Sequence, residues 1–321
     1  DQFTRLVPLI ALRRAAGFER ECHGDLHLGN LVDWQGTVLA FDAIEFDASL
    51  RCIDIVNDVA FTFMDLLAAN LPALAWRFIN AWAEATGDYE GLVLLRAFAA
   101  GRALVRAKVA LLSGGHSAGF ARYWALAERL VQPPPAPRMV LTMGLSGSGK
   151  STVAQFLAEA LGAVRVRSDV ERKRLHGLAP TARPLPGSDL YARDATVRTY
   201  ARLATLAEVL LAAGLPVVLD AAFLLQDERE ALRQLALRLG VPFALVRCVA
   251  PDAVMRARIV ARTQAGADPS DATPDVLDLQ QRVQHPVPGD WAPWTHDVVN
   301  DGTLKALEDQ VRVLAATWKR P

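Results

Sequence analysis

The sequence predicts an α/β protein in which a doubly wound parallel sheet forms the second half and mostly helices form the first half. After residue 138, short apolar runs alternate with amphipathic stretches, as in parallel strands connected by helices that cover both faces. Before residue 132, apolar residues recur three and four positions apart, which is typical of helices. The proline run QPPPAPR lies between these regions and favours an extended linker. We expect domains at 1–132 and 138–321, joined by a linker at 133–137.

The composition supports two domains and indicates no polymeric partner. The chain has 321 residues, which exceeds the size of most single cores. Lys plus Arg equals Asp plus Glu, with 35 of each, so the net charge gives no strong sign of a nucleic-acid partner. The three cysteines lack a CxxC spacing, which favours a reducing cytoplasm over a disulfide framework. No uncharged apolar run reaches the ~18 residues of a membrane helix, so we expect no membrane span.

The first half contains one expected hairpin among its helices. The residues before His23 have an amphipathic helical pattern. Residues 31–42, LVDWQGTVLAFD, predict two short strands around a turn at Gln35–Gly36. Apolar periodicity then predicts helices within 66–87 and 94–112.

The second half alternates strand and helix signals. Most of the expected helices end at glycine or begin with a residue that favours a helix N-terminus. Strands are expected at 139–144, 163–169, 216–223 and 243–250, and helices at 151–162, 200–214, 227–239 and 251–262.

The stretch GLSGSGKST at 144–152 is the most specific motif in the chain. Its glycines let the backbone curve so that successive N–H groups point at phosphate oxygens, and a helix N-terminus follows. Lys150 would contact the β- and γ-phosphates of ATP, and Ser151 would bind Mg²⁺. An apolar strand before it and an amphipathic helix after it favour a phosphate loop over a chance glycine-rich turn. The expected nucleotide-binding residues are Gly144, Ser146, Gly147, Ser148, Gly149, Lys150, Ser151 and Thr152.

Acidic residues after the next two strands predict the acceptor side of a kinase site. Asp169 follows one strand, where ligands bind in open α/β sheets, and could accept the proton of an attacking hydroxyl. Its alternative role is to cap a helix. Arg172, one turn further on, could bind an anionic substrate group or the γ-phosphate. Asp220 ends another strand and could bind Mg²⁺ through water. Because no Glu follows Asp220, a small kinase is favoured over a motor ATPase.

Arg258 and Arg262 are four residues apart and share one helix face. A stretch rich in small and polar residues, 263–275, follows them and resembles a lid. Arginines beside a lid can neutralise charge on a transferring phosphoryl group. A surface pair remains the alternative.

These motifs resemble the P-loop kinases grouped with polynucleotide kinase, gluconate kinase and zeta toxin, over residues 138–300. The resemblance implies that Asp169 is the catalytic base and that Arg258 and Arg262 bind phosphates. The substrates of that group range from nucleic-acid ends to sugars, so the resemblance does not identify the acceptor.

The stretch HGDLHLGN at 23–30 is a second phosphotransferase motif. It resembles the catalytic loop of aminoglycoside phosphotransferases. The resemblance implies that Asp25 is a base, that Asn30 and Asp42 bind Mg²⁺, and that Asp58 supports His23. A helix cap with a chance HGD is the alternative. The family has a nucleotide-binding lobe before this loop, and 22 residues precede it here, so we expect an incomplete second site.

The whole chain resembles bacterial fusions of an aminoglycoside phosphotransferase-like domain with a P-loop kinase domain, truncated at the N-terminus. We expect an ATP- and Mg²⁺-dependent kinase that acts on a small-molecule hydroxyl through the second domain. Chemistry at Asp25 and a non-catalytic ATP sensor are the alternatives. The oligomeric state stays open.

Overall fold

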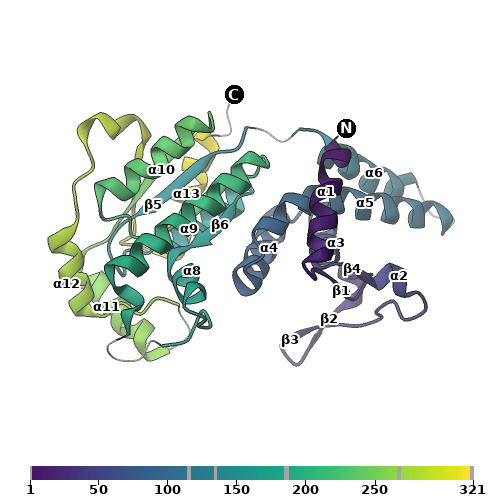
Figure 1. Cartoon of the computed structure of the whole chain (residues 1–321), viewed down its shortest axis with the longest axis horizontal. Coiled ribbons are helices and arrows are strands. Elements are labelled where there is room, and N and C mark those ends of the chain that lie inside the picture. The colour runs from purple at the N-terminus through teal and green to yellow at the C-terminus, as the bar shows by residue number, and fades with distance from the viewer. Residues whose placement is uncertain (1, 114–116, 134–135, 184–187, 266–268, 319–321) are drawn as a thin grey trace. The chain divides into compact units, whose positions relative to one another are not determined.

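The computed structural model describes residues 2–113, 117–133, 136–183, 188–265 and 269–318 (Figure 1). The chain divides into two compact units. The first contains Asp1–Ile79 and Asp88–Pro134, and the second contains Asn80–Gly87 and Pro135–Pro321. Part of the predicted linker, 134–135, and part of the predicted lid, 266–268, lie outside the described residues.

The first unit is largely helical, as predicted. Small buried residues on one face of α5, among them Ala99, Ala103 and Ala107, allow close packing near the buried Phe61 and Met64 of α3. Its helices are α1 (Gln2–Ala15), α2 (Ala48–Arg51), α3 (Ile55–Ala68), α5 (Leu95–Leu112) and α6 (Ser117–Val131), with 3₁₀ turns η1 (Leu28–Asn30) and η2 (Glu90–Leu94). The helix α4 (Pro72–Thr86) begins in this unit, and its residues from Asn80 onward group with the second unit.

Two small antiparallel sheets complete the first unit. The predicted hairpin is confirmed, since β2 (Leu31–Trp34) pairs with β3 (Thr37–Ala40). Gln35 and Gly36 have φ values of 54° and 78°, the left-handed conformation that a two-residue hairpin turn requires. The second sheet, β1 (Glu19–Glu21) with β4 (Cys52–Asp54), was not predicted. Its strands have three residues each and are too short to show an alternation of apolar and polar residues.

A buried ionic cluster joins three segments of the first unit. The Arg13 guanidinium donates to Asp54 Oδ2 at 2.6 Å and to Asp88 Oδ2 at 2.7 Å. All three residues are at least nine-tenths buried. We expect Arg13→Ala to lower the free energy of unfolding by about 3–5 kcal/mol, because it removes the buried guanidinium that pairs with both Asp54 and Asp88. Urea unfolding followed by circular dichroism measures this change.

The neighbouring Arg14 provides the control. Its side chain is 73% exposed and pairs with Glu19 at 3.2 Å. Exposed ion pairs contribute little, so Arg14→Ala should change stability by less than about 1 kcal/mol. Equal effects of the two substitutions would contradict the assigned importance of the buried cluster.

The second unit is built on a five-stranded parallel sheet with strand order β6-β7-β5-β8-β9. This confirms the predicted fold class. The strands are β5 (Met139–Met143), β6 (Val164–Arg167), β7 (Val217–Asp220), β8 (Phe243–Val249) and β9 (Thr295–Val299). The sequence analysis missed β9, because THDVV carries three polar residues and lies at the edge of the sheet.

Helices cover the sheet and bury its apolar residues. On one face, Val140, Val218 and Val246 belong to the same core cluster as Leu157 of α7 and Val311 of α13. Side chains alternate along a strand, so Leu141, Leu219 and Leu245 point to the opposite face. The helices are α7 (Lys150–Leu161), α8 (Ser168–Leu175), α9 (Arg193–Ala212), α10 (Gln226–Arg238), α11 (Asp252–Ala265), α12 (Pro274–Val283) and α13 (Leu304–Trp318), with 3₁₀ turns η3 (Asp189–Tyr191) and η4 (Gly289–Trp294).

Residues of α4 that belong to the second unit bind the edge strand β6. The side chain of Asn80 donates from Nδ2 to Ala163 O at 2.9 Å and accepts from Arg165 N at 2.7 Å. Glu84 accepts from the guanidinium groups of Arg165 and Arg167, each at 2.9 Å. A single amide side chain therefore satisfies two backbone groups on the outer edge of the sheet.

The described part of the chain contains no helix that combines the length and the apolar character needed to cross a membrane.

Candidate functional site

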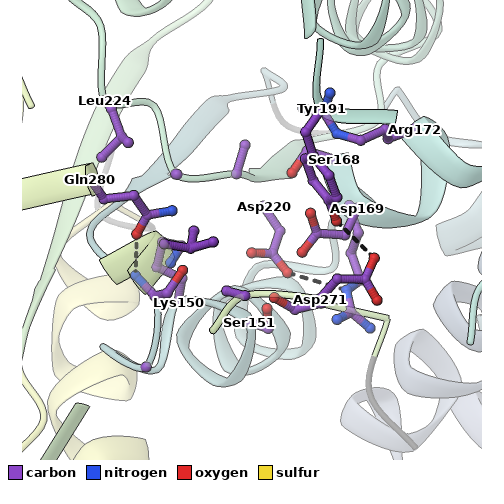
Figure 2. A pocket seen from close by; sticks show the side chains of 18 of the residues that line it. Lys150, Ser151, Ser168, Asp169, Arg172, Tyr191, Asp220, Leu224, Asp271 and Gln280 are labelled. Carbon is purple, nitrogen blue, oxygen red and sulfur yellow. Dashed lines mark hydrogen bonds and ion pairs between the residues drawn. The ribbon is translucent and has the colours of Figure 1, made fainter. Parts of the chain in front are cut away.

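A cavity of about 840 Å³ in the second unit brings the predicted site residues together (Figure 2). It lies at the carboxyl ends of β6 and β7, where ligands bind in open α/β sheets. The predicted residues that line it are Ser146, Gly147, Gly149, Lys150, Ser151, Thr152, Asp169, Arg172, Asp220, Arg258 and Arg262. Two other predicted residues, Gly144 and Ser148, are buried in the loop below and do not line the cavity.

The loop between β5 and α7 has the backbone that its glycines predict. Gly144, Gly147 and Gly149 have φ values of 152°, 81° and 94°. A Cβ on Gly144 would lie 2.6 Å from Cys248 O, and one on Gly147 would lie 2.5 Å from Met255 O. Both the conformation and the space therefore require glycine. The loop leads into the N-terminus of α7, which favours bound anions.

We expect Gly149→Ala to damage the loop. A Cβ there would lie 1.9 Å from Nδ2 of Asn300, which donates to Ser148 O at 2.9 Å. The strained φ and this clash together should lower the free energy of unfolding by about 2 kcal/mol or more and weaken binding of an ATP analogue. Urea unfolding and calorimetry measure the two effects.

Gly240→Ala is the matched control, because Gly240 has a φ of 65° and a Cβ added there would meet nothing within 4 Å. It should cost only about 1 kcal/mol and leave analogue binding unchanged. Loss of binding in the control as well would show that a general loss of stability, rather than damage to the phosphate loop, explains the result.

Lys150 is the first residue of α7 and lies in the cavity. Its Nζ donates to Leu145 O at 2.8 Å, within the same loop. Burial lowers the pKa of Lys150, and the nearby charges of Asp220 and Asp169 oppose that shift. An anion bound at the loop would likewise favour the charged ammonium.

An oxygen atom already accepts a hydrogen bond from one of the loop amides. Oε1 of Gln280, on α12, accepts from the backbone N–H of Ser146 at 2.7 Å, as Figure 2 shows. The Oγ of Ser148 and the Oδ2 of Asp220 are buried, and neither has a hydrogen-bond partner within the described residues. The N–H of Ser146 is therefore a donor suited to a phosphate oxygen, and Asp220 offers a carboxylate oxygen suited to Mg²⁺.

The carboxylates of Asp169 and Asp220 point into the same space in Figure 2. Burial raises the pKa of Asp169, and the charge of Asp220 raises it further, whereas Arg167, Lys150 and Arg172 lower it. Arg167 Nε lies 3.5 Å from Asp220 Oδ2. The N-cap of α8 is Arg167, so the alternative in which Asp169 caps this helix is wrong.

The predicted arginines differ in what they contact. Arg258 donates to Gly147 O at 3.4 Å and to Asn300 Oδ1 at 3.1 Å, so it contacts the phosphate loop directly. Arg262 donates to Ala272 O at 3.4 Å, in the segment predicted as a lid. Arg172 donates to Leu190 O and to Thr196 Oγ1, so the wall of the cavity already uses part of its guanidinium.

Several cavity residues were missed by the sequence analysis. Asp271 accepts from Lys173, Arg183 and Tyr191, which joins the predicted lid segment to residues around α8 and η3. Asn300, which contacts the loop but does not line the cavity, follows β9, so its signal depended on a strand that the sequence analysis missed. The remaining residues come from helices and turns with no motif; they include Gln280, Tyr191, Tyr200 and Glu228.

The second motif lies in the first unit. Asn30 Nδ2 donates to Asp25 O at 3.0 Å and lies 3.3 Å from Asp25 Oδ2. The carboxylate of Asp58 accepts from the N–H groups of His23 and Gly24 at 3.1 and 2.9 Å, so Asp58 stabilises the backbone of the loop. Asp42 is exposed. Among the described residues, no group of three or more His, Cys, Asp or Glu side chains is placed to bind a metal ion in either unit.

A family model and relatives from two mycobacterial species match the sequence of the chain. A family model described as an AAA domain matches residues 139–287, which include the phosphate loop, Asp169 and Asp220. Uncharacterized proteins of Mycobacterium tuberculosis and Mycobacterium bovis are 33% identical over 275 residues, covering 84% of this chain and 54% of theirs. The chain thus spans about half the length of the curated relatives it matches.

Solved kinase structures are similar over part of the chain. A gluconokinase from Sinorhizobium meliloti 1021 is 24% identical, with a TM-score of 0.42, over 57% of this chain and 94% of its own. The APS kinase of Mycobacterium tuberculosis, solved with AMPPNP and APS, is 23% identical, with a TM-score of 0.42, over 58% of this chain and 100% of its own.

Proposed function

We propose that the second unit is an ATP- and Mg²⁺-dependent phosphotransferase that transfers the γ-phosphoryl group to a hydroxyl of a small molecule. One observation carries this proposal. The glycine-rich loop with Lys150 and the carboxylate of Asp169 line the same cavity. A phosphate-binding loop alone would suit a sensor, whereas a carboxylate facing the same space supplies an acceptor for the proton of a hydroxyl.

The phosphates of ATP would bind at the start of α7. Loop N–H groups and Lys150 would contact the β- and γ-phosphates, and the amide oxygen of Gln280 would leave Ser146 N–H as a phosphate oxygen arrives. Arg258 and Arg262 line the cavity on α11 and would neutralise charge on the transferring group. The loop, the helix and the two arginines would thereby fix the γ-phosphoryl group for in-line attack.

Ser151 Oγ and the Asp220 carboxylate would bind Mg²⁺, which when bound neutralises phosphate charge. Asp169 would orient the acceptor hydroxyl and take its proton as the oxygen bonds to the γ-phosphorus and ADP leaves. Its raised pKa makes it a better proton acceptor than an exposed aspartate.

The test is mass spectrometry of a metabolite extract incubated with ATP, Mg²⁺ and the protein. We expect phosphorylated products that are absent with Asp169→Asn and absent when the metal is chelated. Binding of an ATP analogue without any such product would instead support a sensor.

The first unit supports a second candidate, a phosphotransferase site at Asp25. The supporting observation is that α3 stabilises the loop: Asp58 and Asp65 accept from its N–H groups, and Thr62 donates to Leu26 O. In this case Asp25→Asn would abolish product formation, while Lys150→Ala would not.

A further inference from the structure

The part of the cavity lining that comes from α8, η3, α9 and α10 contains more acidic than basic groups. The residues concerned are Asp169 and Arg172 of α8, Tyr191 of η3, Thr196 and Tyr200 of α9, and Glu228 of α10. We call them the acceptor wall. Lys150, Arg258 and Arg262 line the same cavity but belong to the nucleotide-binding elements α7 and α11. Within the acceptor wall, two carboxylates therefore face one guanidinium. Arg167 also lines the cavity, but its guanidinium pairs with Glu84 at 2.9 Å and lies 3.5 Å from Asp220.

The protein itself uses part of the Arg172 guanidinium. Its Nη1 donates to Leu190 O at 3.2 Å and to Thr196 Oγ1 at 3.1 Å. The guanidinium carbon lies 5.1 Å from the centre of the Tyr191 ring. The residue is only 7% exposed, and its Nε is buried without a hydrogen-bond partner in the described chain. Arg172 is thus built into the wall and presents little donor surface to a ligand.

Glu228 adds a second carboxylate to the wall. It accepts from Leu225 N at 3.3 Å and hydrogen-bonds with Tyr200. Burial raises the pKa of Glu228, while its hydrogen bonds and the charges of Arg229 and Arg172 lower it. Tyr200 also accepts from Phe223 N at 3.4 Å. Both groups are therefore positioned by the start of α10, and Glu228 offers a fixed acceptor oxygen to a bound molecule.

An anionic acceptor would place its charge beside Asp169 and Glu228 in a partly desolvated space, where like charges repel strongly. A hydroxyl or ammonium group would instead donate to Glu228. We propose that the acceptor is a polyhydroxylated molecule without an anionic group, which donates a hydrogen bond to Glu228 from a hydroxyl or an ammonium. This inference rests on the proposed kinase function and names the substrate class of the same site.

The test uses three matched groups of acceptors. The neutral group contains D-glucose, glycerol and myo-inositol, the amino group contains D-glucosamine and serinol, and the acidic group contains D-gluconate and D-glycerate. ATP-dependent phosphorylation of each is measured with the full chain, together with binding in the presence of AMPPNP. We expect kcat/KM for the best neutral or amino acceptor to exceed that of its acidic counterpart at least tenfold.

Glu228→Gln tests whether Glu228 causes the preference for neutral and amino acceptors. Glutamine keeps the acceptor oxygen for Leu225 N, so the start of α10 is preserved. We expect KM for an amino acceptor to rise at least tenfold, KM for a neutral acceptor to rise less, and the acidic group to improve. Glu230→Gln, on the same helix, is the control, because Glu230 pairs with Arg233 and does not line the cavity.

Each other outcome counts against the inference. A preference for the acidic group would overturn it while leaving the kinase function intact. An unchanged preference in Glu228→Gln would overturn the role of Glu228. No product from any group, with AMPPNP still bound, would overturn both the inference and the proposed function.

Discussion

Lys150→Ala is expected to lower kcat/KM for phosphoryl transfer about 10³-fold and to weaken binding of AMPPNP. Lys150 is the only lysine that lines the cavity within the described residues, and it lies at the N-terminus of α7. Removing one positioned donor to a phosphate in a desolvated site typically costs about 10²–10³-fold in rate, and loss of a full charge belongs at the upper end. Steady-state kinetics with an acceptor found in the metabolite extract and calorimetry with AMPPNP measure the two effects.

Lys305→Ala is the control for the loss of a lysine. Lys305 is exposed on α13 and pairs with Asp309 within one helix. Its removal should leave both rate and binding unchanged. If Lys150→Ala transfers phosphate as fast as the unmodified protein, the phosphate loop is not the nucleotide site, and the motif at Asp25 becomes the stronger candidate.

Asp169→Asn is expected to lower kcat about 10²–10⁴-fold while AMPPNP binding is preserved. Asparagine keeps the size of the side chain and removes its ability to take a proton. This separation of chemistry from binding distinguishes Asp169 from Lys150, whose loss affects both. Asp227→Asn, at the exposed start of α10, controls for the loss of one carboxylate. Equal kcat in Asp169→Asn and the unmodified protein would exclude Asp169 as the base.

The raised pKa of Asp169 gives two pH dependences with definite signs. Activity needs the carboxylate form, so kcat should fall as pH decreases through a value above the ordinary range for aspartate. A carboxyl group whose pKa is raised by folding binds its proton more tightly in the folded state, so it favours folding at low pH and opposes it at neutral pH. Asp169→Asn should therefore unfold at a higher temperature than the unmodified protein at pH 7, and the difference should shrink as pH falls.

Much of the nucleotide side could be predicted from the sequence because its signals are local. The phosphate loop requires glycine at particular φ values within nine residues, and strand and helix patterns on either side fix its position. Asp169 and Asp220 were found because each follows or ends an apolar strand, and parallel strands place such residues at one edge of the sheet.

The acceptor side depends on contacts between distant segments, which leave no local pattern. Glu228 lies in the charged first turn of α10, where the sequence suggests an exposed side chain. The tertiary fold places it near Tyr200 and Arg172. The same holds for Gln280, whose contact with Ser146 joins residues 134 positions apart. For Arg172, the sequence predicted a place in the site but not the hydrogen bonds that its side chain makes with Leu190 and Thr196.

The hydrogen bonds from Asn80 to β6 affect how the protein can be dissected. A fragment that starts in the proline-rich stretch would contain the whole parallel sheet but would lack Asn80 and Glu84. The backbone groups that Asn80 binds at the edge strand β6 would then lack this partner. Such exposed edges can pair with another molecule and cause aggregation. An expression fragment of the second unit should therefore begin upstream of α4, well before the boundary that the prolines suggest.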